Sequence, residues 1–111
     1  MKLRIRGNFI RLRLTPAEIA RLRDAGKVEE TVEFGRSSFV YTLETAETES
    51  ARASFDASRL LVSIPRRQAS AWADSDEVGI ETVQPNGSEK GLRILIEKDF
   101  ACRHKETSEK I

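Results

Sequence analysis

Cys102 and His104 are the only cysteine and the only histidine of the 111-residue chain. They lie in the segment EKDFACRH, which also contains the carboxylates Glu97 and Asp99. A thiolate and an imidazole at this spacing could bind zinc or act as a nucleophile and its base. Because zinc takes three or four protein ligands, the pair predicts a metal site only if a dimer axis joins two copies.

The same segment has a simpler interpretation as the end of a strand. Phe100 and Cys102 would then pack at the edge of the core, with their charged neighbours solvated or ion-paired. The chain also contains no GxGxxG, P-loop, GxSxG or HExxH motif. We therefore expect no catalytic residue and no cofactor, and Cys102 and His104 remain the metal-ligand candidates. An enzyme that uses this pair is the third of three functional alternatives.

A cluster of basic residues lies at the start of the chain. The segment KLRIRGNFIRLRL alternates apolar and charged residues around Gly7-Asn8, which predicts a β-hairpin with a two-residue turn. In that register Arg4 faces Arg11 and Lys2 faces Arg13, opposite to the apolar face. Directly opposed like charges destabilise a hairpin by about 0.2–1 kcal/mol per pair, so anions are expected nearby. The candidate anion-binding residues are Lys2, Arg4, Arg6, Phe9, Arg11 and Arg13.

Two sources of anions are open for this basic face. A nucleic acid could place phosphates on the basic side chains and stack a base on Phe9. Alternatively, Glu29 and Glu33 could neutralise the arginines in cis if the strand VEETVEF lies beside the hairpin. The net charge of +1 and the isoelectric point near 7.9 favour neutralisation in cis, because dedicated nucleic-acid binders usually exceed about 9. A polyanion or nucleic-acid binder is thus the second alternative.

The elements that position these groups follow local signals. Thr15 as N-cap, Pro16 at the first helical position, Glu18 in a capping box and Gly26 as C-cap predict a helix over residues 16–25. Alternating patterns predict strands over VEETVEF, SFVYTLE, ARASF, RLLVSI, EVGIETV and LRILIE, and the segment PRRQASAWADS predicts a second helix. Trp72 of that helix is expected to fill the core between helix and sheet.

Both halves of the chain follow the order strand, strand, helix, strand, strand. An offset of about 50 residues superposes Ile19 on Ala69 and Leu22 on Trp72. This predicts an α+β fold in which two duplicated ββαββ units form a mostly antiparallel sheet with two short helices on one face. We expect a single domain over residues 1–102 and a polar, frayed tail over residues 103–111.

Composition bounds the class of protein. With 39% apolar and 33% charged residues, the chain is typical of a soluble globular protein. A single cysteine and the lack of an apolar segment long enough for a signal peptide or a membrane span predict a cytoplasmic protein without membrane contact. The first functional alternative is a non-enzymatic binding or assembly module. A free sheet edge could pair with a second copy, giving a homodimer, or with another protein.

Three segments carry a resemblance to a known family. The segments KLRIRGNFIRLRLTPAEIARL, SAWADSDEVGI and LIEKDFACR resemble those of a family of small bacterial proteins with a domain of unknown function. The resemblance covers most of the chain and implies a bacterial, cytosolic, single-domain protein, with no known activity, cofactor or catalytic residue. Family members carry an acidic tail after the last segment, whereas this chain continues with HKETSEKI.

Overall fold

The computed structural model describes residues 1–99, which form an α+β fold as predicted. In chain order the elements are β1 (Lys2–Ile5), β2 (Phe9–Leu14), α1 (Pro16–Ala25), β3 (Lys27–Glu33), β4 (Ser38–Ala46), β5 (Arg52–Asp56), β6 (Arg59–Pro65), α2 (Arg66–Ala73), β7 (Gly79–Gln84) and β8 (Leu92–Lys98). The predicted helix over residues 16–25 has these bounds in the structure. The tail that was predicted over residues 103–111 lies outside the described residues.

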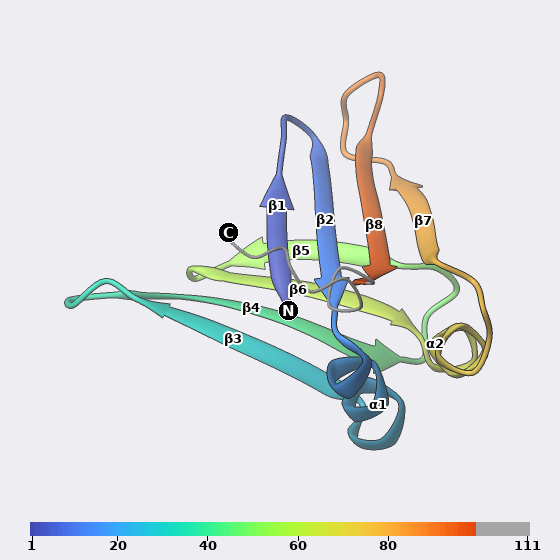
Figure 1. Ribbon diagram of the computed structural model, residues 1–111. Helices are drawn as coiled ribbons and strands as arrows, with labels where there is room; N and C mark the ends of the chain where they lie inside the picture. The colour runs from blue at the N-terminus through green and yellow to red at the C-terminus, as the bar shows by residue number, and fades with distance from the viewer. Residues whose placement is uncertain (100–111) are drawn as a thin grey trace.

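The strands divide into two four-stranded sheets instead of the single sheet that the sequence suggested. Sheet A has the order β1-β2-β8-β7, and sheet B has the order β3-β4-β6-β5. Figure 1 shows the strands of sheet A standing across those of sheet B, with both helices together at one side. Each sheet therefore covers part of the inner face of the other, and the helices close one side of the shared core.

The two halves of the chain contribute to both sheets. In the first half, β1–β2 lies in sheet A and β3–β4 in sheet B, whereas in the second half β5–β6 lies in sheet B and β7–β8 in sheet A. Each sheet therefore contains one hairpin from each half. The hairpins pair antiparallel, and the central pairs β2–β8 and β4–β6 are parallel. Ile5 pairs with Ile10 in β1–β2, and Phe55 pairs with Leu60 at the equivalent place in β5–β6. This arrangement is consistent with duplication of a ββαββ unit.

The core forms where apolar residues alternate along the central strands. In β2, the residues Ile10, Leu12 and Leu14 are buried while the residues between them are partly exposed. This period of two aims one side of the strand at the core and leaves the other side at the surface. Trp72 of α2 is fully buried, and its indole Nε1 donates a hydrogen bond to the carbonyl of Val78 at 3.2 Å. Trp72 therefore has the core position expected for it.

Local capping explains where α1 begins and ends. The Thr15 side chain accepts a hydrogen bond from the Glu18 amide at 3.3 Å, and the Glu18 carboxylate accepts one from the Thr15 amide at 2.9 Å. Gly26 ends the helix with φ 83°, which is a left-handed conformation that glycine adopts without strain. Among the described residues, neither helix has the length and apolarity needed to cross a membrane.

The α-amino group of Met1 holds the start of β1 in place. It is buried, forms an ion pair with Glu18 and donates a hydrogen bond of 2.9 Å to Glu30. Tyr41 donates from its hydroxyl to the Met1 carbonyl at 3.1 Å. Burial opposes the charge of the ammonium group, but its bonds to Glu18 and Glu30 are stronger together and raise its pKa. Sheet A is thus tied to α1 and to sheet B where the basic hairpin begins.

Candidate anion-binding face

The outer face of sheet A is the face that points away from the core. We call it the basic face. Two acidic residues lie on it, one on β7 and one on β8, among a larger number of basic ones. Its charged side chains are Lys2, Arg4, Arg6, Arg11, Arg13, Glu81, Arg93 and Glu97.

The hairpin has the predicted register. Lys2 pairs with Arg13 and Arg4 pairs with Arg11, and the Arg6 amide donates to the Phe9 carbonyl at 2.9 Å across the turn. Each opposed pair of cations costs roughly 0.2–1 kcal/mol if it is left uncompensated. The structure therefore contains the charge conflict that the sequence predicted.

Glu97 resolves part of this conflict. Because β2 runs parallel to β8, Arg13 lies beside Glu97 in the sheet. The Glu97 carboxylate accepts from Arg11 Nη2 at 2.7 Å and from Arg13 Nε at 3.2 Å. Only 12% of the Glu97 side chain is exposed, so solvent screens these charges less than at an open surface. Lys2 Nζ lies 3.6 Å from the Asp99 carboxylate. Neutralisation in cis thus takes place at the start of β1.

Glu29 and Glu33, the expected source of this neutralisation, lie elsewhere. Their strand, β3, belongs to sheet B, where it pairs with β4. Glu29 accepts from the Thr42 hydroxyl at 2.7 Å and lies 3.9 Å from Arg59, while Glu33 accepts from the Ser38 hydroxyl at 3.0 Å. The alternative in which Glu29 and Glu33 neutralise the arginines is therefore wrong, because its condition, that β3 lies beside the hairpin, is not met. A local strand pattern does not define which sheet a strand joins.

Toward the hairpin turn, two cations of β1 and its end have no acidic partner within residues 1–99. Arg4 and Arg6 are exposed and form no ion pair with any residue from 1 to 99. Arg11 has a buried Nε atom without a hydrogen-bond partner in that same range, although its Nη2 is bonded to Glu97. Within residues 1–99, carboxylates thus compensate the positive charge of the basic face at the start of β1 but not at Arg4 and Arg6.

A hollow of about 410 Å³ lies at this uncompensated end. Its lining combines two apolar side chains with three guanidinium groups: Arg4, Ile5, Arg6, Phe9 and Arg11. On the β8 side of Phe9, the Arg93 guanidinium lies over the ring, 4.1 Å from its centroid, and Arg93 donates to Glu81 at 2.6 Å. Aromatic and apolar surface next to Arg4 and Arg6, which have no acidic partner within residues 1–99, can bind an anion that also has a flat or apolar part.

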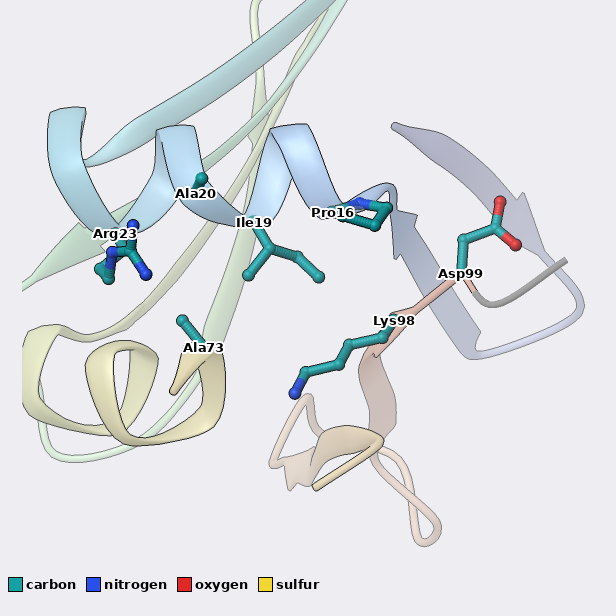
Figure 2. A pocket seen from close by; sticks show the side chains of 7 residues that line it. All are labelled: Pro16, Ile19, Ala20, Arg23, Ala73, Lys98 and Asp99. Atoms are coloured by element: carbon teal, nitrogen blue, oxygen red, sulfur yellow. The ribbon is translucent and has the colours of Figure 1, made fainter. Parts of the chain in front are cut away.

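A second pocket, of about 250 Å³, lies between the two helices and the end of β8. Figure 2 shows Arg23 and Asp99 at opposite ends of it, with Ile19 and Ala73 between them. Its basic groups already have acceptors, because Arg23 binds Asp24 and Asp74 and Lys98 Nζ donates to the Ser75 carbonyl at 2.6 Å. This pocket therefore offers mainly apolar surface.

The segment EKDFACRH is only partly within the described residues. Cys102 and His104, together with Phe100, lie outside them, and so does any metal or catalytic site built on that pair. Among residues 1–99, no group of three or more potential ligands could hold a metal ion. The described end of the segment has a clear role, since Glu97 and Asp99 act as counter-ions of the basic hairpin.

Three contributors to this face were missed by reasoning from the sequence. They are Arg93, Glu81 and Glu97 as a counter-ion. Their places on this face follow only from the pairing of β8 with β2. The alternation in LRILIE puts Arg93 and Glu97 on one side of their strand, which was an available signal. The parallel pairing between the two ends of the chain has no comparable local signal.

The fold and the site define a class of protein: an α+β protein of two crossed sheets, one of which has an open basic face. The whole chain, residues 1–111, matches a family of unknown function, DUF7009, and the protein belongs to that family. No curated protein and no solved structure matches the chain.

Proposed function

We propose that this protein is a non-enzymatic binding module whose basic face takes an anionic partner. The observation that carries the proposal is the contrast within one hairpin. Lys2, Arg11 and Arg13 have carboxylates in cis, whereas Arg4 and Arg6 beside the hollow have none among residues 1–99. A cytoplasmic location, which the single cysteine favours, forms part of the proposal.

Charge energetics support this function. Arg11 has a role in folding as a partner of Glu97, but folding alone gives no reason for a cation at Arg4, because it repels Arg11 and an uncharged residue at that position would relieve the repulsion. An external anion at the hollow would offset the repulsion and would bind more than one guanidinium group at once. Guanidinium groups suit this role, since they form paired hydrogen bonds with phosphates and carboxylates.

A salt titration with a charge-matched pair of variants tests the proposal. The probe is inorganic polyphosphate, and its affinity for the wild type should fall linearly with salt on logarithmic axes. The variant Arg4→Gln/Arg6→Gln should bind about tenfold more weakly and lower the salt slope by about two. The control Arg36→Gln/Arg67→Gln changes the net charge equally but lies in the β3–β4 turn and on α2. Equal losses in both variants, or no binding by the wild type, would refute the proposal.

A second candidate function, association with another protein chain, is favoured by apolar side chains on sheet B and in its β3–β4 turn. Phe34 and Phe55 are 68% and 67% exposed, and Val32 is 41% exposed. The Phe55 ring lies 6.3 Å from that of Phe39, which continues the apolar surface toward Tyr41. Exposed apolar clusters of this kind often mark protein contacts.

Sedimentation velocity over a range of concentrations tests this second candidate. If these side chains join two copies, the wild type should dimerise and Phe34→Ser/Phe55→Ser should stay monomeric with unchanged thermal unfolding. The matched control Val78→Ser/Val83→Ser replaces two exposed apolar residues outside sheet B and should leave the dimer intact. A wild type that is monomeric at every concentration would count against a homodimer.

A further inference from the structure

Phe9 and the hollow beside it indicate which kind of anion the basic face would take. Phe9 lies on the central strand β2, with Arg93 of β8 on one side and the hollow on the β1 side. Arg93 covers the ring from the β8 side and is itself held by Glu81. Arg93 therefore holds the Phe9 ring in position on its β8 side, and the ring also forms part of the wall of the hollow.

The size and lining of the hollow fit a flat ring system with a charge attached. Its volume of about 410 Å³ lies in the range of roughly 300–1,000 Å³ that is common for pockets of small organic ligands. Arg4 lies on β1 and Arg6 directly follows the end of that strand, so that in extended chain their attachment points are about 7 Å apart. Two guanidinium groups at that spacing can hold successive phosphates while Phe9 contacts a base.

We propose, resting on the function proposed above, that the ligand is single-stranded nucleic acid. One base enters the hollow and stacks against Phe9, and the adjoining phosphates bind Arg4 and Arg6. Stacking on an aromatic side chain needs an unpaired base, and it adds affinity without strong sequence preference.

The width of sheet A argues against a duplex. The β1–β2 hairpin is paired along β2 with β8, so it cannot enter a groove as an isolated two-stranded ribbon. Four strands at about 4.8 Å spacing place the outer strand axes about 14 Å apart before side chains are counted. The major groove of B-DNA is only about 12 Å wide. The basic face is thus suited to a strand that lies across it.

The experiment compares oligomers that share phosphates and differ in bases. Fluorescence anisotropy would measure binding of a twelve-nucleotide oligo(dT), an abasic oligomer of the same length, a duplex and inorganic polyphosphate. Oligo(dT) should bind about tenfold more tightly than the abasic oligomer, because the stacked base adds affinity that phosphates alone do not supply. Phe9→Leu should remove this advantage and leave polyphosphate binding within twofold. Phe9→Tyr, which keeps the ring, should retain it, and Val83→Ala on the same face is the matched control.

If the wild type binds oligo(dT) and the abasic oligomer equally well, the proposal that a base stacks on Phe9 is refuted. This result does not depend on whether any variant folds. A duplex that binds at least as tightly would overturn the assignment to a single strand. An oligo-glutamate that binds as tightly as oligo(dT) would replace nucleic acid by an acidic protein segment. Polyphosphate binding without preference for oligo(dT) would refute this inference alone, whereas no binding of any anion would refute the proposed function as well.

Discussion

Arg4 lies directly opposite Arg11 across the β1–β2 hairpin, and of the two only Arg11 reaches a carboxylate among residues 1–99. Arg4 and Arg11 differ in this way because their strands have different places in sheet A. β2 has a second neighbour, β8, which carries Glu97, whereas β1 is an edge strand of sheet A. The edge position leaves Arg4 and Arg6 without a counter-ion among the residues that the structure describes, next to the hollow at Phe9.

Removal of the counter-ion should strengthen anion binding. In Glu97→Gln, Arg11 and Arg13 lose the carboxylate that they share, and their charge becomes available to a ligand. Polyphosphate affinity at low salt should rise several-fold, and the free energy of unfolding should fall by about 1 kcal/mol. Glu44→Gln on sheet B changes the net charge equally and should raise affinity little. Calorimetric titration and urea unfolding check the two effects, and a Glu97→Gln protein that binds no better than Glu44→Gln would contradict the account.

The pH dependence of stability should reveal the buried N-terminal ammonium group. Its pKa is raised above the ordinary 8.0 despite burial, because Glu18 and Glu30 bond to it. The pKa of Glu18 is lowered from its ordinary 4.5 even though burial opposes this, through bonds to the ammonium group and to Thr15. The ion pair between the Met1 ammonium group and Glu18 therefore contributes fully to the free energy of unfolding between about pH 4.5 and 8. This contribution decreases as pH rises through the raised pKa of the amine and as pH falls through the lowered pKa of the carboxylate.

The variant Glu18→Gln tests this linkage. It should lower the free energy of unfolding at pH 7 by about 1–3 kcal/mol, because a charge-assisted bond to a buried ammonium is lost. Its stability should also decrease less than that of the wild type when the pH is raised from 7 to 10. Glu89→Gln, in the β7–β8 loop, is a control with equal change in charge. Urea unfolding at several pH values measures the effect, and parallel pH profiles for wild type and Glu18→Gln would disprove the linkage.

Trp72 should report on folding and not on binding. Its side chain, on α2, is fully buried. Trp72→Ala should therefore lower the free energy of unfolding by about 3–5 kcal/mol. Trp72→Phe should cost less, since it keeps much of the volume and loses the hydrogen bond to Val78. Saturation with polyphosphate should leave the emission maximum of the wild type unchanged. A shift of that maximum on binding would place the ligand near α2 and contradict the assignment to the basic face.

The local parts of this fold were predictable because local chemistry determines them. The two-residue turn and the strict alternation around Gly7-Asn8 define the hairpin register, and Thr15, Glu18 and Gly26 define the ends of α1. These signals act over a few residues, where steric and hydrogen-bond preferences dominate.

Long-range pairings were not predictable in the same way. Nothing near Arg13 in the sequence indicates that Glu97 lies beside it, since the parallel β2–β8 pair joins the two ends of the described chain. Glu29 could neutralise the hairpin only if its strand lay beside it, yet β3 pairs in sheet B. The basic face was therefore recognised from the hairpin, and its true counter-ions were not.

The most direct test is a nuclear magnetic resonance titration that follows arginine side-chain Nε–Hε signals at low salt while inorganic polyphosphate is added. The account predicts that the signals of Arg4, Arg6 and Arg11 move together and saturate at one concentration, while those of Arg36 and Arg67 stay in place. Arg11 is a sensitive reporter, because its Nε has no hydrogen-bond partner within residues 1–99. Shifts centred on Arg36 or Arg67, or no shifts at all, would contradict the claim that the basic face binds anions.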